Sequence, residues 1–198
     1  MKNQFDALRK VVGFFLLAVI LCLTACGAPA EKENPQQPEA VPSVEKTAIP
    51  GTWTVPEGWV KAERYSTEDK IFYVEEGHEG DEQPDNISIE VGTNRYGTED
   101  HLKFRDAIVR QLTMQAGSVG AELTGEGTFT DQEDVLYIFA ISEEDVVTKQ
   151  FYIVGDQRYC LVHLTSFTGS ESAEEAARAM ADSFIWEQRK IEREEVFS

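Results

Sequence analysis

The chain has 198 residues, of which 36 are acidic and 18 basic, so its formal net charge is −18. Proteins that bind nucleic acid present basic patches, and this acidic excess argues against such a partner. It also argues against direct binding to anionic lipid headgroups. Hydrophobic residues make up 41% of the chain, which is enough for a packed core. The length predicts one folded domain with terminal extensions.

The N-terminus has the layout of a secretory signal peptide. Residues 1–10 are net positive, residues 11–23 form an apolar run of 13 residues, and small residues follow. A membrane-spanning helix needs about 20 apolar residues, so this run is too short for one. We therefore expect residues 1–25 to be removed as a signal peptide, with an uncleaved signal anchor as the alternative.

The end of this run, Leu23-Thr24-Ala25-Cys26, resembles the bacterial lipobox. The resemblance implies diacylglyceryl transfer to the Cys26 sulfur and cleavage before that residue. It places the protein at the cell membrane, lipid-anchored on the extracytoplasmic face, in the outer leaflet of the cytoplasmic membrane if the cell is Gram-positive. Two acyl chains bury enough methylene groups to hold a protein stably. Cys22 is the rival, but it follows Leu21, which is too large to precede the cleavage site.

Beyond Cys26, composition divides the chain. Five of the seven prolines and no aromatic residue lie in residues 27–50, so we expect residues 26–50 to be a lipidated cysteine and a disordered linker. A folded domain is predicted for residues 51–186, and residues 187–198 form a charged tail. The mature protein would start at Cys26.

The first half of the predicted domain contains strand-like runs and then one helix. Strands are expected at residues 52–55, 59–65, 70–76 and 86–93. In residues 100–116 an apolar residue recurs at every fourth position, which predicts an amphipathic helix with Thr98 or Asp100 as N-cap and Gly117 as its end. The predicted stripe is Phe104, Ile108, Leu112 and Ala116.

The second half predicts four strands and a final helix. The strands, at residues 121–130, 134–141, 146–154 and 158–167, have short links that favour antiparallel neighbours, including a two-residue turn at Gly155–Asp156. Residues 135–141 are apolar on both faces, so their strand should be central. The helix should start with a capping box at 172–175. Its apolar stripe is Ala173, Ala176, Ala177, Met180 and Phe184.

This order of elements opens on Val55-Pro56-Glu57-Gly58-Trp59 and closes on Ser183-Phe184. It resembles the PsbP/MOG-like fold, found in the extrinsic photosystem II protein and in several bacterial lipoproteins. The resemblance covers residues 51–186. It implies an α+β fold in which an antiparallel β-sheet is sandwiched by helices, an α/β/α sandwich. It also implies that the protein binds or stabilises partner proteins, and it carries over no catalytic residue.

An acidic loop around residues 75–85 holds the only candidates for a metal site, Glu76, His78, Asp81 and Asp85. Oxygen-rich loops bind calcium, and a histidine adds affinity for transition metals. Their spacing does not match an EF-hand. We favour a solvated charged loop over a metal site, and we expect no cofactor.

The remaining candidates for chemistry favour a non-enzyme. Cys160 and His163 are three residues apart on one strand and should point to opposite faces, with the cysteine buried, while His101 lies in the first turn of the middle helix. The chain has no G-x-S-x-G, HExxH or CxxC motif, although a Ser–His–Asp site of scattered residues stays open. Trp53, Trp59 and Trp186 lie at element ends and are interpreted as core or rim, with a partner surface as the alternative.

We therefore expect a membrane-anchored extracytoplasmic lipoprotein that acts as a non-enzymatic binding or stabilising module for an envelope protein. The first alternative is binding of a small ligand or metal through the acidic loop and a groove between helix and sheet. The second alternative is an unrecognised hydrolase.

Overall fold

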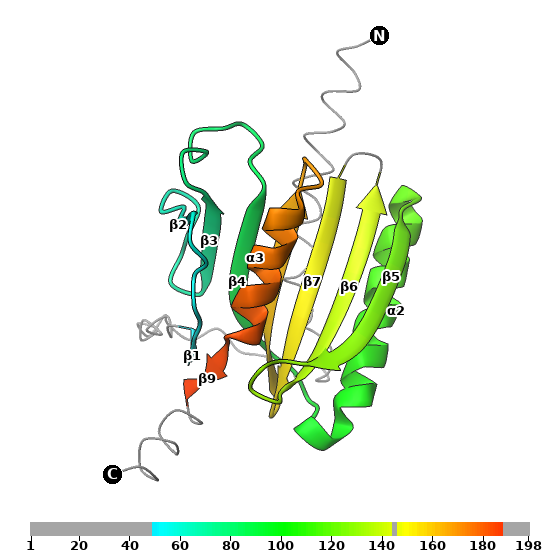
Figure 1. Cartoon of the computed structure of the whole chain (residues 1–198). Helices are drawn as coiled ribbons and strands as arrows, with labels where there is room; N and C mark the ends of the chain where they lie inside the picture. Colours follow the sequence, from blue (N-terminus) through cyan, green and yellow to red (C-terminus); the bar gives the residue numbers. More distant parts are fainter. Residues whose placement is uncertain (1–48, 144–145, 188–198) are drawn as a thin grey trace, which may run out of the picture. The chain divides into compact units, whose positions relative to one another are not determined.

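A computed structural model describes residues 49–143 and 146–187 of the chain (Figure 1). Its strands are β1 (Gly51–Thr52), β2 (Trp59–Lys61), β3 (Lys70–Glu75), β4 (Asn86–Thr93), β5 (Glu122–Phe129), β6 (Val135–Glu143), β7 (Val146–Gly155), β8 (Arg158–Ser166) and β9 (Ile185–Trp186). Its helices are the short 3-10 helix η2 (Thr98–Asp100) and the α-helices α2 (His101–Val119) and α3 (Glu171–Asp182). Cys26 and the predicted signal peptide, together with residues 26–48 of the linker and 188–198 of the tail, lie outside the described residues.

Seven strands form one antiparallel sheet in the order β2-β3-β4-β8-β7-β6-β5. Helix α3 crosses one face of this sheet, and α2 lies on the other face along β5 (Figure 1). This confirms the predicted α+β class, an antiparallel sheet sandwiched by helices. No helix in the described part of the chain is long and apolar enough to cross a membrane.

The face under α3 holds the larger hydrophobic core. Alternate residues of β4, β6, β7 and β8 point to this face because side chains in a strand alternate between the two sides of the sheet. Small side chains on α3 let the helix lie close to the sheet, and the predicted stripe of Ala173, Ala176, Ala177, Met180 and Phe184 is fully or almost fully buried, as predicted. The strand side chains of this core include Ile87, Ile89, Leu136, Phe151, Ile153, Cys160, Val162 and Leu164.

The face under α2 is rich in aromatic side chains. Phe104 on the helix packs 5.8 Å from the ring of Tyr152 and 5.4 Å from that of Tyr159, measured between centroids. The other residues of the predicted stripe on α2, Ile108, Leu112 and Ala116, are also buried, so the four-residue period correctly located the buried side of this helix.

Two of the predicted strands are shorter than expected. Of the first region, residues 52–55, only Thr52 is strand; it belongs to β1, which pairs with Ile185–Trp186 in a separate two-stranded sheet. The second region is strand only over Trp59–Lys61, since Ala62 and the residues after it fold back in turns; the N–H groups of Tyr65 and Ser66 donate to the Ala62 carbonyl. The apolar residues of these two regions predicted strands. The length of each strand depends on how many of its residues pair with a neighbouring strand.

Both predicted helix boundaries that depend on small residues are wrong. Helix α2 passes through Gly117 and ends at Gly120, whose φ of 71° is a left-handed conformation that suits glycine. Helix α3 begins at Glu171 with Ser170 as N-cap, so Ser172 lies inside the first turn and forms no capping box. The Ser172 hydroxyl instead donates to Glu75 Oε1.

Two predicted details of the sheet also need correction. The turn between β7 and β8 is Asp156–Gln157, one residue later than expected, because Gly155 pairs with Arg158 as the last residues of the ladder. Strand β6 is buried on both faces, as predicted, but it lies next to the edge; the central strand is β8.

Candidate functional site

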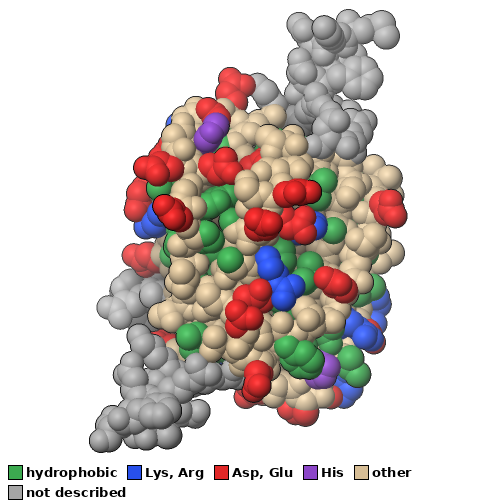
Figure 2. Space-filling view, viewed as in Figure 1, with side chains coloured by type: hydrophobic (Ala, Val, Ile, Leu, Met, Phe, Trp, Pro, Cys, Tyr) green, Lys and Arg blue, Asp and Glu red, His purple; other side chains and the backbone are tan. Residues whose placement is uncertain are grey.

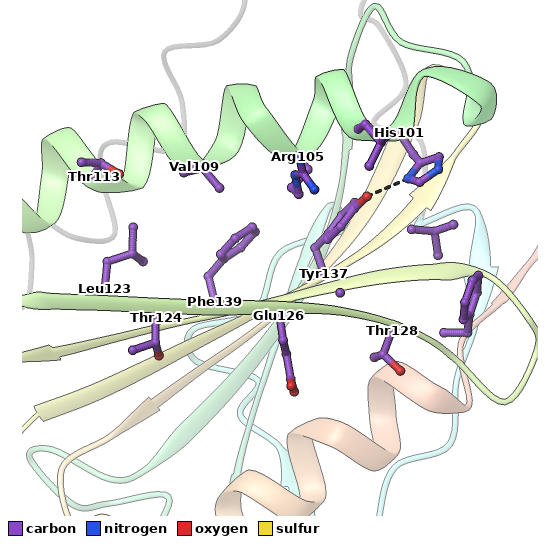
Figure 3. A pocket seen from close by; sticks show the side chains of 15 residues that line it. His101, Arg105, Val109, Thr113, Leu123, Thr124, Glu126, Thr128, Tyr137 and Phe139 are labelled. Atoms are coloured by element: carbon purple, nitrogen blue, oxygen red, sulfur yellow. Dashed lines mark hydrogen bonds between the residues drawn. The ribbon is translucent and has the colours of Figure 1, made fainter.

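A groove of about 800 Å³ lies between α2 and the edge strand β5 (Figure 3). From the helix, Arg105 and Val109 point toward the strand. From β5, Leu123 points into the groove, whereas Thr124, Glu126 and Thr128 point to the other face of the sheet. The groove is therefore lined by α2 on one side and by alternate residues of the edge strand on the other.

The floor of the groove is aromatic because two glycines of β5 leave room for rings. Gly125 pairs with Phe139 and Gly127 pairs with Tyr137 on β6. A Cβ atom on Gly125 would lie 2.5 Å from the Phe139 ring, and one on Gly127 would lie 3.0 Å from the Tyr137 ring. Each ring thus leans over a glycine of the edge strand.

One end of the groove is closed by a polar contact and bordered by exposed apolar side chains. His101 Nδ1 lies 2.6 Å from the Tyr137 hydroxyl, and the two rings stack with centroids 6.1 Å apart. Burial raises the pKa of Tyr137, so this hydroxyl stays protonated at neutral pH. Next to this contact, Leu102 is 51% exposed and Phe129 is 62% exposed. Large apolar side chains with this exposure, beside an apolar groove, are typical of a binding surface.

The backbone of β5 is open along the groove. The N–H of Thr130 donates to the carbonyl of Asp134 at 2.9 Å, so this pair is a hydrogen-bonded pair at the end of the β5–β6 ladder. Such pairs alternate along an antiparallel ladder. The N–H and C=O groups of the odd-numbered residues of β5 therefore point away from β6. These residues are Leu123, Gly125, Gly127 and Phe129.

The opposite face of β5 is acidic. Glu122 and Glu126 are exposed, and neither forms an ion pair with any residue that the structure describes. Acidic side chains also predominate over basic ones on the face of the molecule that carries α3 (Figure 2). The edge strand thus combines an apolar groove on one face with negative charge on the other.

The structure does not bring the four metal candidates together. Among the residues described, no group of three or more His, Cys, Asp or Glu side chains is arranged to hold a metal ion. His78 and Asp81 form an exposed pair at 2.7 Å, and the hydrogen bond to Asp81 raises the pKa of His78. Asp85 is buried, and its carboxylate accepts hydrogen bonds from Ser166, Phe167 and Thr168.

The candidate catalytic residues are also separated. Cys160 is fully buried under α3, and burial raises the pKa of its thiol well above the ordinary value. His163 points to the other face of the sheet, as predicted, and burial lowers its pKa to about 4, with the Lys70 charge adding to the effect. Its neighbour across the ladder is Ser88, but no hydrogen bond joins a serine to a histidine in the described parts of the chain.

The tryptophans belong to the core and its rim, in agreement with the sequence interpretation. Trp59 is 8% exposed and Trp186 is 4% exposed. Trp53 is partly buried, and its indole N–H donates to the Tyr73 hydroxyl at 3.1 Å. None of the three lines the groove.

Comparison with known proteins finds similar solved structures. The chain is similar to the solution structure of cyanobacterial PsbP (CyanoP) from Synechocystis sp. PCC 6803, with 14% identity and a TM-score of 0.41 over 75% of this chain and 98% of that chain. No family model and no curated protein matches the sequence. This likeness says nothing of activity or partner, and the fold class rests on the sheet and the two helices.

Sequence reasoning named a groove between helix and sheet but not the residues that form it. The signal was present as Gly125-Glu126-Gly127, two glycines on one face of a strand, because glycine in a strand marks a close approach of backbone or ring. The missing information was the place of β5 at the edge of the sheet, beside α2.

Proposed function

We propose that the protein is a lipid-anchored, non-enzymatic module on the extracytoplasmic face of the cell membrane, and that it binds or stabilises a protein partner of the envelope. The anchor is inferred from Leu23–Cys26, and the linker in residues 26–50 would let the domain reach away from the membrane. The groove between α2 and β5 is the observation that carries the binding role.

The groove suits a protein better than a small molecule. Its volume falls in the range of small-ligand sites, but such sites orient their ligand with a few free polar groups. Here the histidine and the arginine of the lining are engaged. His101 bonds to Tyr137, and the Arg105 guanidinium bonds to the carboxylate of its neighbour Asp106. What remains is an apolar strip, the open backbone of β5 and exposed Leu102 and Phe129, which is the composition of a protein-binding surface.

The test is site-specific photocrosslinking in intact cells. A benzophenone amino acid at Phe129 should crosslink to one discrete envelope protein. The same amino acid at Tyr65 should not, although Tyr65 is similarly exposed, at 49% against 62% for Phe129. Tyr65 follows β2 at the opposite edge of the sheet, so it serves as a matched control. Equal crosslinking from both positions, or none from Phe129, would contradict the proposal.

A further inference from the structure

The two edges of the sheet differ. Strand β2 at one edge has three residues, whereas β5 at the other has eight. Exposed edge strands are templates for pairing with another chain, and proteins blunt them by making them short or by adding lysine or proline. Strand β2 is short and ends on Lys61, while β5 carries no lysine or proline. Strand β5 is thus the edge at which this sheet is able to grow.

From this edge and its groove we infer that the protein binds an extended peptide segment of its partner as an added strand on β5, with apolar residues alternating with basic ones. The inference rests on the proposed binding function and specifies its mode. The added strand would pair with the outward N–H and C=O groups of Gly125 and Gly127, beneath α2. Main-chain hydrogen bonds of this kind give affinity, and the pockets for alternate side chains give specificity.

The alternation follows from the two faces of β5. Residues of an added strand opposite Gly125 and Gly127 would direct their side chains into the groove, over the Tyr137 and Phe139 rings. The two glycines have no side chains of their own, so the rings that lean over them form the apolar surface that these side chains would contact. Apolar side chains are therefore favoured at every second position of the peptide.

The other positions of the peptide would face the acidic side of β5. Their side chains would lie across from Glu122 and Glu126, which have no basic partner among the described residues. Oppositely charged cross-strand pairs stabilise a sheet, and like charges destabilise it. Lysine or arginine is therefore favoured at these positions.

The same charges disfavour a second copy of this chain as the occupant. If two β5 strands paired in antiparallel fashion, Glu122 and Glu126 of both copies would lie on one face of a continuous sheet. Four uncompensated carboxylates in neighbouring positions would repel one another. The acidic edge thus opposes self-pairing while it remains open to a basic strand.

The test measures binding of a synthetic probe, acetyl-Val-Lys-Val-Lys-Val-Lys-Val-amide, to the full chain in detergent. Because the protein is acidic, a basic peptide could also bind by charge alone. A second probe, N-methylated at its valines, keeps the charge and removes the N–H groups that would bond to β5. A third probe replaces lysine with glutamate. We expect both to bind at least about tenfold more weakly than the first.

Paired variants locate the site. Gly127→Ala and Gly127→Pro add the same Cβ beside the Tyr137 ring, but only proline removes the outward N–H, and neither removes a bond to β6. We expect Gly127→Pro to weaken binding roughly tenfold relative to Gly127→Ala. Glu126→Gln should weaken binding about two- to fivefold, while Glu68→Gln, in the β2–β3 loop near the far edge, should not. Amide exchange of Gly125 and Gly127 should slow when the peptide binds.

Several outcomes would overturn this inference. These are no binding of the first probe at millimolar concentration, equal binding of the N-methylated probe, or equal binding by the two Gly127 variants. A dimer of the free chain that Gly127→Pro abolishes would show a second copy as the occupant instead.

If the Phe129 crosslink persists while the probe fails, the proposed binding function stands and only the strand-addition mode is wrong. If the probe binds as expected and the crosslink is absent, the proposed envelope partner is the part that fails.

Discussion

The carboxylate of Asp85 and the hydroxyl of Ser166 lie 2.9 Å apart, although 81 residues separate them in the sequence. The same carboxylate accepts hydrogen bonds from the backbone N–H groups of Phe167 and Thr168 and from the Thr168 hydroxyl. Asp85 therefore ties the loop before β4 to the segment that joins β8 to α3. A residue first considered as a metal ligand has its oxygens occupied by the fold itself.

We predict that Asp85→Ala lowers the free energy of unfolding by about 3 kcal/mol. Hydrogen bonds to a charged group each contribute roughly 1.5–3 kcal/mol, and the donors would be left without a partner. Urea denaturation of the full chain measures the change. Asp81→Ala in the same loop removes an exposed carboxylate and should change stability by less than about 0.5 kcal/mol. Similar losses for the two variants would show that Asp85 does not tie these segments together.

Stability should fall as the pH drops from about 6.5 toward 4 because of His163. Burial lowers its pKa to about 4 in the folded chain, whereas an unfolded histidine titrates near 6.5. Between these values only the unfolded state takes up the proton. The part of the free energy of unfolding that depends on neutral His163 is therefore complete above pH 6.5 and is lost on acidification. The difference in pKa corresponds to roughly 3 kcal/mol.

The measurement compares the wild-type chain with His163→Gln. Protonation of the many carboxylates changes stability in both proteins, so only the difference between them reports on His163. That difference should shift in favour of His163→Gln by about 3 kcal/mol between pH 7 and pH 4. A difference that is independent of pH would mean that His163 is accessible to solvent in the folded state.

Cys160 should be unreactive in the folded protein. Its side chain is fully buried under α3, and burial raises the pKa of the thiol, so little thiolate forms. Modification by a chromogenic disulfide reagent should be at least about a hundredfold slower than in 6 M guanidinium chloride, because it requires transient opening. In Cys160→Ala, an added Tyr65→Cys supplies an exposed thiol and should react at once. Equal rates for Cys160 and that exposed thiol would contradict its burial.

Replacement of the lipobox cysteine tests the proposed anchor. Cys26→Ala should leave the chain without the mass of a diacylglyceryl group and with its N-terminal segment uncleaved. Cys22→Ala, four residues earlier in the same apolar run, should leave both properties as they are in the wild type. Mass spectrometry of the intact protein and fractionation of cells measure the outcome. An unchanged mass in Cys26→Ala would contradict the lipoprotein assignment.

The buried faces of this fold could be predicted from local patterns. The four-residue period of Phe104, Ile108, Leu112 and Ala116 gave the inward side of α2, and the alternation in residues 86–93 gave β4. Both patterns follow from the geometry of a single helix or strand, so no knowledge of the tertiary structure is required. The same is true of the opposite orientations of Cys160 and His163.

Features that depend on distant partners could not be predicted. Gly117 and Gly120 are equally plausible ends for α2 in sequence, and only the backbone conformation shows that the helix stops at Gly120. The place of β6 beside the edge, rather than at the centre, depends on β8 pairing with β4 across the sheet. The groove depends on the same kind of long-range arrangement, because it forms only with β5 at the edge of the sheet and α2 beside it.

The pairing of Gly125 with Phe139 and of Gly127 with Tyr137 gives this groove a signature that can be read in other sequences. Two glycines at positions i and i+2 of one strand face two aromatic residues at positions j and j+2 of the next. In a related chain where one of these glycines is replaced by a larger residue, the aromatic residue paired with it should also be replaced. The reason is that a side chain at the glycine position and a full ring beside it compete for the same space. Joint replacement, with a larger residue on the edge strand and a smaller one opposite, would preserve the sheet and fill the groove.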